Sequence, residues 1–298
     1  MTKKIAVINN KGGSAKTPTS INLAGAYAKR HPHKKVLIVE TDGQGNATRS
    51  FNMKASSFEN TMYDVFMNQS SPEECIANAF QNIDIIPANS DMNFVEFDVM
   101  NTLKSEMSKR VMDVFQNTKM PLTLANLEGV MQSQSNLTDS YFNMLAGKFD
   151  SLEGTYDLII FDTPPEIKGV TSSVLAIADE AIIPFEPDTY SIDGIRNILT
   201  RIGTIKRDIN PNLNIAGLLA VKVKGNTKLH IDTINGVMKF SNRMGLYYFQ
   251  SEIPNSIRFA SSTSYKGLPA TITQQDNKFV MSYYNLLDEL IERGVIDG

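Results

Sequence analysis

Residues 9–17 read NNKGGSAKT and lie between a short apolar run, Lys4–Asn9, and a segment with helical spacing, Lys16–Arg30. A strand, a glycine-rich turn and a helix in this order bind phosphate, because backbone N–H groups curl around the anion and the positive end of the helix faces it. A lysine at the helix start adds a charge for the β- and γ-phosphates, and the hydroxyl after it can ligate Mg²⁺. The stretch therefore predicts a nucleotide-binding loop in which Lys16 and Thr17 have these roles.

Short apolar runs alternate with helical segments along most of the chain. Runs rich in Ile and Val and bounded by turn residues indicate buried parallel strands. The expected strands are Lys4–Asn9, Lys35–Glu40, Ile83–Pro87, Asp157–Phe161, Glu180–Pro184 and Leu213–Val223. The expected helices are Lys16–Arg30, Pro72–Phe80, Ser173–Ala178, Ile192–Asp208 and Thr227–Arg243. This alternation predicts an α/β fold, a doubly wound, mostly parallel sheet with helices on both faces.

Two further stretches of the chain indicate helices. Residues 71–74, Ser-Pro-Glu-Glu, are typical of a helix start. Ser71 would be the N-cap, Pro72 would lie in the first turn, and the side chain of Glu74 would reach back to the cap. The segment from about residue 89 to 154 has no convincing strand and is rich in Met, Asn and Gln. Its apolar positions at helical spacing are Met107, Val111, Val114 and Phe115. We expect one domain over residues 1–298, with a helical insertion at about 89–154 whose Met residues fill a core.

The composition excludes several classes of protein. A chain of 298 residues with 42% hydrophobic residues can bury a core without disulfides. Its one cysteine, Cys75, has no partner for an internal disulfide and no companions for a zinc or iron–sulfur site. No apolar stretch reaches the roughly 18 residues of a membrane span, and the amino-terminal run is too short for a signal peptide. We therefore expect a soluble, cytoplasmic protein.

Positive charge is concentrated toward the carboxyl terminus. Residues 1–189 carry 16 Lys and Arg against 23 Asp and Glu, whereas residues 190–298 carry 13 against 9. A basic region on an acidic protein can mark a surface for a polyanion, and it can equally be a solvated face with no partner.

The glycine-rich loop is not of the ordinary kind. It has an additional lysine, Lys11, before its glycine pair, and Ala15 replaces its last glycine. The pattern K-G-G-x-x-K-[S/T] resembles the deviant Walker A box of the ParA/MinD family of dimeric ATPases. The resemblance implies a P-loop NTPase fold in which Lys11 reaches the phosphates of a partner subunit, Lys16 those of its own, and Thr17 ligates Mg²⁺.

Two further boxes support the resemblance. Glu40–Thr48, ETDGQGNAT, is similar to the family's D-x-D-x-Q-x-N-x-T switch, with Asp42 at the carboxylate that orients the attacking water and Glu40 where aspartate is usual. Such a carboxylate is needed because phosphoryl transfer depends on alignment of the nucleophile. Asp157–Pro165, DLIIFDTPP, resembles the Walker B box, in which Asp162 would hold Mg²⁺ through water.

The resemblance continues into the carboxyl-terminal half. Glu180–Gly194 and Pro211–Leu219 resemble later strands and turns of the family, and Ile253–Arg258 with Lys266–Pro269 resembles the segment that contacts adenine. It assigns ATP binding to Lys11, Gly12, Gly13, Ser14, Ala15, Lys16, Thr17, Pro18, Pro254 and Asn255, with Lys11, Lys16 and Asp42 as catalytic residues.

Two residues of the loop depart from the family pattern. A left-handed backbone at Ala15 would cost about 1 kcal/mol. Pro18 suits the first turn of a helix but lacks an N–H that could face the α-phosphate. We expect nucleotide binding to survive both.

The first functional interpretation is DNA partition. The resemblance implies a homodimer formed with ATP, binding to nonspecific double-stranded DNA over the nucleoid, and a ParB-like adaptor that stimulates slow hydrolysis. Contacts from Lys and Arg to phosphate would dominate such binding. The candidates for these contacts are Arg207, Lys222, Lys224, Lys228, Lys239 and Arg243. Because the boxes begin at residue 5, we expect no amino-terminal helix-turn-helix.

Three alternatives to DNA partition need other sequence features. A MinD-like membrane switch needs a basic amphipathic terminal helix, whereas Phe279–Arg293 carries Asp288, Glu289 and Glu292 against one arginine, so no membrane partner is expected. An electron carrier of the nitrogenase iron-protein type needs cysteines that this chain lacks. A nucleotide-regulated scaffold with little hydrolysis remains open, because Pro18 and Glu40 are unusual.

Overall fold

A seven-stranded sheet forms the centre of the molecule. The structure is a computed structural model that describes residues 2–118, 123, 141–225 and 227–298. The strands are β1 (Lys3–Val7), β2 (Val36–Glu40), β3 (Ala77–Phe80), β4 (Ile83–Ile86), β5 (Leu158–Asp162), β6 (Glu180–Phe185) and β7 (Asn214–Ala220). Their order is β3-β4-β2-β5-β1-β6-β7, and every neighbouring pair is parallel except β3 with β4. The predicted strands and the predicted fold class are therefore confirmed.

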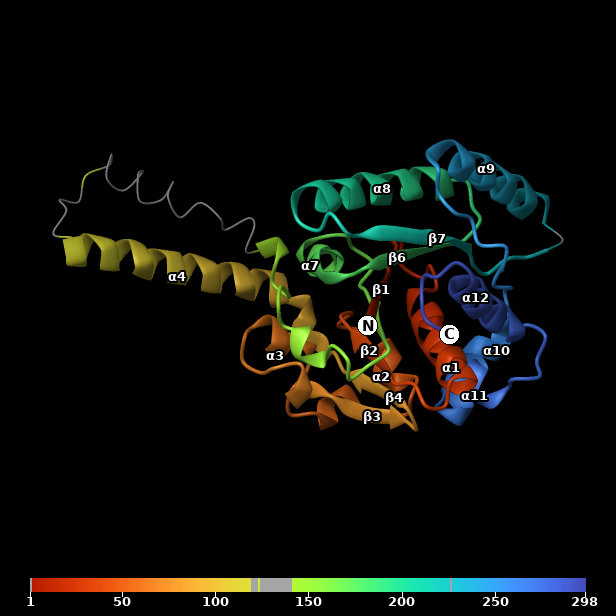
Figure 1. Cartoon of the computed structure of the whole chain (residues 1–298), viewed down its shortest axis with the longest axis horizontal. Coiled ribbons are helices and arrows are strands. Elements are labelled where there is room, and N and C mark those ends of the chain that lie inside the picture. Colours follow the sequence, from red (N-terminus) through yellow and green to blue (C-terminus); the bar gives the residue numbers. More distant parts are fainter. Residues whose placement is uncertain (1, 119–122, 124–140, 226) are drawn as a thin grey trace.

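Helices cover both faces of the sheet, with α8 and α9 along one side and α1 and α12 along the other (Figure 1). The long helices are α1 (Lys16–Arg30), α4 (Val95–Thr118), α7 (Gly169–Ile177), α8 (Ser191–Asp208), α9 (Lys228–Met244) and α12 (Met281–Glu292). The short ones are α2 (Asn46–Arg49), α3 (Met62–Phe66), α10 (Ile257–Ser261) and α11 (Ala270–Thr273). The predicted helices corresponding to α1, α7, α8 and α9 are confirmed.

Each face of the sheet has its own apolar core, because successive strand residues point to opposite sides. Leu37 and Phe161 belong to the core shared with α7, α8 and α9. Ile38 and Ile160 belong to the core shared with α1 and α12. All four side chains are fully buried. Among the residues that the structure describes, no helix combines the length and apolar character needed to cross a bilayer.

The predicted helix Pro72–Phe80 is wrong. Its start is as expected, since the Ser71 N–H donates to Glu74 at 2.8 Å, but the turn ends after Glu73–Cys75. The chain then continues as β3, which pairs with β4, because these residues complete the sheet edge instead of extending a helix. Cys75 is buried beneath this turn, and burial raises the pKa of its thiol to about 12.

Both edges of the sheet are modified. At one edge β3 is four residues long, and its pairing with β4 shifts register between Asn78 and Phe80. At the other edge, residues 247–249 run beside β7. There the Leu218 N–H donates to Tyr247 O at 2.9 Å, and the Phe249 N–H donates to Leu218 O at 3.0 Å.

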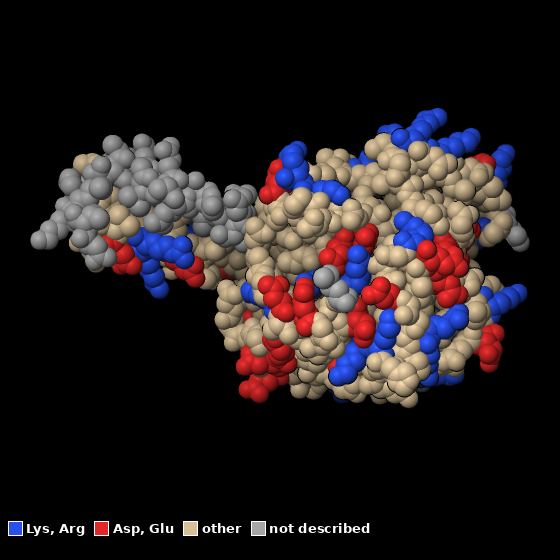
Figure 2. Space-filling view, in the orientation of Figure 1, with Lys and Arg blue, Asp and Glu red and all other residues tan. Residues whose placement is uncertain are grey.

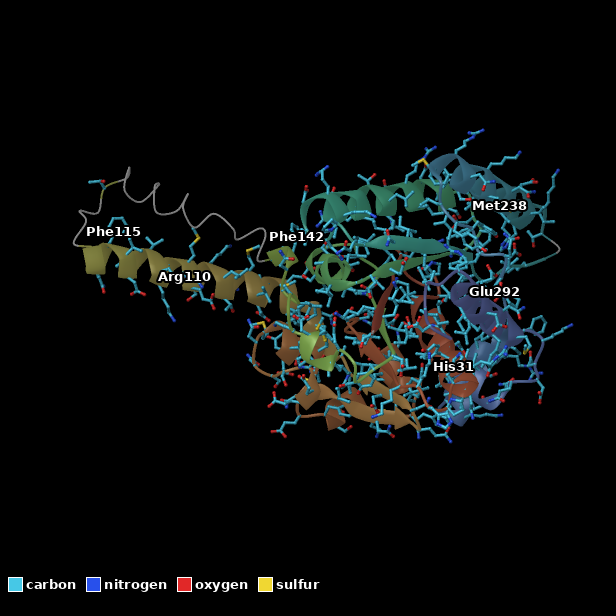
Figure 3. All side chains as sticks on the ribbon, viewed as in Figure 1. His31, Arg110, Phe115, Phe142, Met238 and Glu292 are labelled. Atoms are coloured by element: carbon cyan, nitrogen blue, oxygen red, sulfur yellow. The ribbon has the colours of Figure 1, made fainter. Side chains whose placement is uncertain are left out.

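Residues 90–118 of the region from 89 to 154 are mostly helical, whereas residues 143–149 form turns, and α4 extends away from the sheet (Figure 1). Arg110 and Phe115 mark its outer half (Figure 3). Val111 and Phe115 are buried, which fits their predicted apolar spacing. Residues 119–122 and 124–140 lie outside the described part. That this region is an insertion stays a prediction.

Helix α1 approaches α11 most closely at Gly25. A methyl group built there would lie 2.4 Å from Thr271 Oγ1 and 3.1 Å from Ile272 Cγ1. Thr271 cannot easily turn away, since its hydroxyl donates to Asn22 O at 3.0 Å and its side chain is fully buried.

Gly25→Ala should therefore destabilise the protein, although alanine is the better helix former. We expect the free energy of unfolding in a urea titration to fall by about 1–3 kcal/mol from overpacking. Gly203→Ala in α8 is the matched control, since an added methyl group meets nothing within 4 Å. It should gain about 0.5–1 kcal/mol. Equal effects of the two substitutions would contradict this account of the α1–α11 contact.

Candidate functional site

The predicted motifs meet at the carboxyl ends of the parallel strands. The register places Val7 of β1 and Glu40 of β2 on either side of Asp162, the last residue of β5. The loops that follow these three strands therefore leave the same edge of the sheet. In open α/β sheets, ligands bind outside this edge.

A cavity of about 1120 Å³ opens between these loops. Its walls include residues 12–18, Asp42, Pro165, Lys222 and residues 253–257. Of the ten residues predicted to bind ATP, nine line this cavity: Gly12, Gly13, Ser14, Ala15, Lys16, Thr17, Pro18, Pro254 and Asn255. Lys11 is the exception.

Asn9 connects the start of the loop to β6. Asn9 Oδ1 accepts the Lys11 N–H at 2.7 Å, while Asn9 Nδ2 donates to Pro184 O at 2.6 Å. Ala15 adopts the left-handed conformation anticipated from the sequence, with φ at 59°. The buried hydroxyl of Ser14 has no hydrogen-bond partner within the described residues. An unpartnered buried hydroxyl beside a ring of N–H groups fits an anionic ligand.

Lys16 lies at the start of α1 and is mostly buried. Its Nζ donates to Asn9 O at 3.2 Å and to Lys11 O at 3.3 Å, so the ammonium group curls back over the loop. Burial lowers the pKa of Lys16, and the charges of Asp162 and Asp42 oppose this effect. A phosphate in the cavity would give this ammonium group a direct ion pair, which it does not form with any described residue.

Asp162 accepts hydrogen bonds from two hydroxyl groups of α1. Thr17 Oγ1 donates to Oδ2 at 2.7 Å, and Ser20 Oγ donates to Oδ1 at 3.1 Å. Burial raises the pKa of Asp162 to about 6, and these hydrogen bonds oppose the rise. Sequence reasoning missed Ser20, although its position three residues after Thr17 places it on the same helix face.

These oxygen atoms suit a hard cation. Mg²⁺ prefers carboxylate, hydroxyl, phosphate and water oxygens, and keeps several waters. Within the described ranges, no group of three or more His, Cys, Asp or Glu is arranged to hold a metal ion. Thr17 and Asp162 therefore fit a magnesium ion whose remaining ligands are phosphate and water.

Glu40 and Asp42 have different surroundings, although only one residue separates them. Asp42 lines the cavity, and its Oδ1 accepts the Gln44 N–H at 3.0 Å. Glu40 is fully buried and accepts the N–H groups of Ala47 at 2.6 Å and Thr48 at 3.2 Å. Burial raises the pKa of Glu40 to about 7, and its hydrogen bonds oppose the rise. Glu40 therefore anchors α2, while Asp42 is the carboxylate free to face a ligand.

Lys11 is not among the residues that line the cavity. Its side chain is half exposed and forms an ion pair with Asp188, in the loop after β6. The hydrogen bond to Asp188 raises the pKa of Lys11. Asp188 was not identified from the sequence, because 177 residues separate it from Lys11.

The predicted DNA-binding residues separate into three groups. Lys224, Lys228, Lys239 and Arg243 are exposed, and none forms an ion pair with a residue that the structure describes. Figure 2 shows Lys and Arg side chains projecting along the edge where α8 and α9 lie. Arg207 is exposed but paired with Asp208 at 2.6 Å. Lys222 lies in the wall of the nucleotide cavity.

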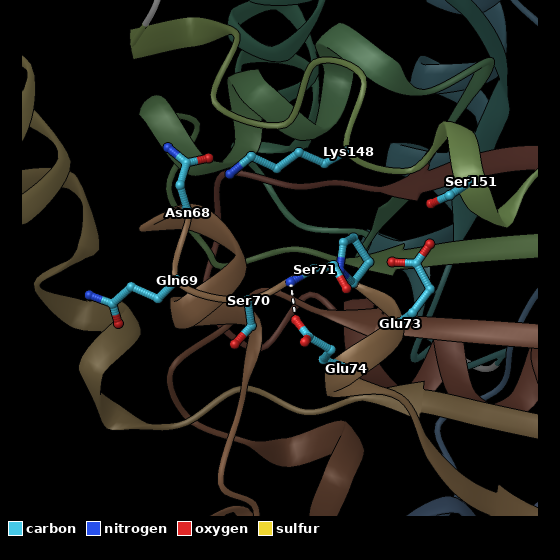
Figure 4. A pocket seen from close by; sticks show the side chains of 9 residues that line it. Asn68, Gln69, Ser70, Ser71, Glu73, Glu74, Lys148 and Ser151 are labelled. Carbon is cyan, nitrogen blue, oxygen red and sulfur yellow. Dashed lines mark hydrogen bonds between the residues drawn. The ribbon is translucent and has the colours of Figure 1, made fainter.

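A second, shallow hollow of about 370 Å³ lies between residues 68–74 and the segment that carries Lys148 and Ser151 (Figure 4). Lys148 donates to Val65 O at the end of α3, and burial lowers its pKa to about 8. A hydrogen bond from Ser151 lowers the pKa of Glu73. Lys148 and Ser151 therefore hydrogen-bond to Val65 and Glu73, and these contacts hold together the two segments that line the hollow.

Comparison with known proteins agrees with the geometry of the cavity. The family model described as "AAA domain" (AAA_31) matches residues 2–120 and 115–215. A ParA family protein of Mycoplasma pneumoniae is 26% identical over 298 residues, covering 96% of each chain. The sporulation initiation inhibitor protein Soj of Bacillus subtilis is 27% identical over 296 residues, covering 99% of this chain and 100% of its own. The chain belongs to the ParA/MinD-type P-loop ATPases.

A solved structure supports the fold of this ParA/MinD-type ATPase. The cobyrinic acid a,c-diamide synthase of Mycobacterium smegmatis, with bound ATP analog and magnesium, has a TM-score of 0.72 and is 20% identical. The match covers 99% of this chain and 96% of that one. The resemblance stated from the loop, the switch and the Walker B box is thereby confirmed at the level of family and fold.

Ser20→Ala should weaken this ATPase fold at Asp162. The buried carboxylate would lose one of its two hydroxyl donors, so we expect the free energy of unfolding to fall by about 1–3 kcal/mol. Ser241→Ala in α9 is the matched control, since that hydroxyl is equally buried but donates only to Met238 O. It should cost less than about 1 kcal/mol in the same urea titration. A Ser20→Ala effect no larger than that of the control would show that the Asp162 contact is not important for stability.

Proposed function

We propose that this protein is an ATP-dependent dimeric switch ATPase for partition of a plasmid or chromosome. The observation that carries the proposal is that Lys16, Thr17 and Asp42 line one cavity, with the buried Asp162 hydrogen-bonded to Thr17. The similarity to ParA and Soj proteins supports partition or positioning as the activity. The finer parts of the proposal are that the ATP dimer binds nonspecific double-stranded DNA and that a ParB-like adaptor stimulates hydrolysis.

Binding of a nucleotide would begin at the loop. The N–H groups of residues 12–17 would surround the phosphates, and Lys16 would exchange its carbonyl partners for phosphate oxygens. Thr17 and Asp162 would hold the magnesium ion, Asp162 through water. A bound magnesium ion supplies neutralisation of the charge on the β- and γ-phosphates. Residues 253–257, which include Pro254 and Asn255, would contact the adenine.

Hydrolysis would then depend on Asp42. It lines the cavity without an ion pair to any described residue, so its carboxylate can accept a hydrogen bond from the attacking water. A fixed acceptor aligns the nucleophile, and alignment is most of what phosphoryl transfer requires from the protein.

Dimer formation would use Lys11. Its ammonium group is half exposed and lies outside the cavity of its own subunit, bound to Asp188. A cation in this position can reach a phosphate that a second copy presents. ATP would then favour the dimer, and hydrolysis would release it.

DNA binding would use α9. Lys228, Lys239 and Arg243 lie close to one face of this helix, because their positions differ by 11 and then by four. With Lys224 they form a set of exposed cations that carry no ion pair to a described residue. Such charges bind phosphate without sequence preference and release counterions, so binding falls steeply as salt rises. The ATP form would then be associated with the nucleoid in the cytoplasm.

Membrane attachment is the less favoured output. Helix α12 buries Leu286, Leu287 and Leu290 against the body of the protein. Glu289 on the same helix accepts the Ser251 N–H at 2.6 Å and is held within the fold. A helix used in this way has no free apolar face for a bilayer.

The first test is a nucleotide series read by size-exclusion chromatography and retention on random duplex DNA. ATP with Mg²⁺ should give a dimer that binds DNA, whereas ADP should give a monomer that does not. Lys228→Gln, Lys239→Gln and Arg243→Gln should each lower the slope of log K against log salt by about 1. Arg207→Gln is the control with an already paired charge and should change it little. Binding that ignores nucleotide or salt would refute the DNA proposal.

The second test separates the roles of Lys11 and Asp42 by measuring phosphate release and dimerisation. Lys11→Ala should bind ATP but form no ATP-dependent dimer and lose most turnover. Asp42→Ala should form the dimer and stay on DNA, with turnover reduced about 100-fold or more, since the attacking water loses its acceptor. A Lys11→Ala protein with normal turnover would refute the role across the interface. A wild type that binds ATP without any turnover would instead identify a scaffold.

A further inference from the structure

Lys222 occupies an unusual position just after β7. It has a left-handed backbone, with φ at 54°, although it is not a glycine. Its neighbours are fixed on both sides: the Val221 N–H donates to Phe185 O at 2.9 Å, and the Val223 N–H donates to Ile253 O at 3.0 Å. The left-handed residue therefore lies between two hydrogen-bonded residues, and its backbone conformation sets the direction of the Lys222 side chain.

The side chain of Lys222 is directed at the phosphate-binding loop. It lines the nucleotide cavity, and a methyl group built on Gly13 would lie 3.8 Å from its Nζ. Gly13 is itself left-handed, with φ at 73°, and belongs to the glycine pair of the loop. A second lysine thus reaches the loop from a different strand end than Lys16.

The present partner of Lys222 does not account for this arrangement. Its Nζ lies 3.3 Å from Glu186 Oε2, and both side chains are about one-third exposed or more, at 40% and 32%. An ion pair of this exposure contributes little to stability. A left-handed backbone at a non-glycine residue is costly, and such strain is concentrated at functional sites.

We propose that Lys222 is a phosphate-binding residue of the nucleotide site, acting within its own subunit, and that Glu186 is the counter-ion that the nucleotide displaces. This inference rests on the proposed function, since it concerns the same cavity. It reassigns Lys222 from the DNA-binding surface to the nucleotide site. A nucleoside triphosphate would then meet Lys16 from α1 and Lys222 from β7, on different sides of the loop.

Glu186 links this residue to the rest of the site. It begins the loop after β6 that also carries Asp188, the partner of Lys11. The two carboxylates, two residues apart, therefore hold the two lysines that flank the phosphate-binding loop. A nucleotide that takes Lys222 from Glu186 leaves this carboxylate near Lys11.

The test is isothermal titration of the full-length protein with a non-hydrolysable ATP analogue and Mg²⁺. Lys222→Met should weaken binding about tenfold, which corresponds to about 1.4 kcal/mol. Lys206→Met is the matched control, because this lysine is exposed on α8 and outside the cavity, and it should stay within twofold of wild type. Glu186→Gln should tighten binding a few-fold, because the competing carboxylate is removed, and this gain should vanish in the double variant with Lys222→Met.

Lys222→Gly separates binding from folding. It removes the cation and also relieves the backbone strain, so it should unfold no more readily than wild type and yet bind as weakly as Lys222→Met. Wild-type affinity in Lys222→Met or Lys222→Gly would overturn this inference and leave the proposed function intact. Absence of binding by the wild type would overturn both.

Discussion

The burial of Asp162 is the constraint on which the site depends. A carboxylate that is 0% exposed at the end of a central strand is costly unless hydrogen bonds compensate it. Thr17 and Ser20 from α1 provide them, while the main-chain carbonyl of Asp162 accepts the N–H of Thr41 at 2.9 Å. One residue therefore fixes the phosphate loop, the Walker B strand and the switch segment relative to one another.

The sequence predicted the parts of the site that lie within continuous motifs. A glycine-rich turn between a strand and a helix determines its own geometry, so the residues from Gly12 to Pro18 could be placed from their order alone. Asp42 and Asp162 could be placed because the segments that carry them resemble the switch and Walker B boxes of the ParA/MinD family. The family could be recognised from the sequence because three such motifs occur in the order that the family has them.

The parts that sequence reasoning missed depend on distant contacts. The Lys11–Asp188 and Lys222–Glu186 pairs join segments 177 and 36 residues apart, and no local pattern records such a pairing. The turn at Glu73–Cys75 has a proper helix start, yet its continuation is decided by β4, which the local sequence does not contain. The role of Glu40 also depends on a contact that its own motif does not reveal, because its carboxylate accepts hydrogen bonds from the N–H groups of α2.

The structure of the two sheet edges limits how copies of this chain can associate through their strands. At β3 the short length and the register shift offer a poor template for a further strand, and at β7 the main-chain groups of Leu218 are already occupied by residues 247–249. Lateral growth into a continuous intermolecular β-structure is therefore discouraged at both ends.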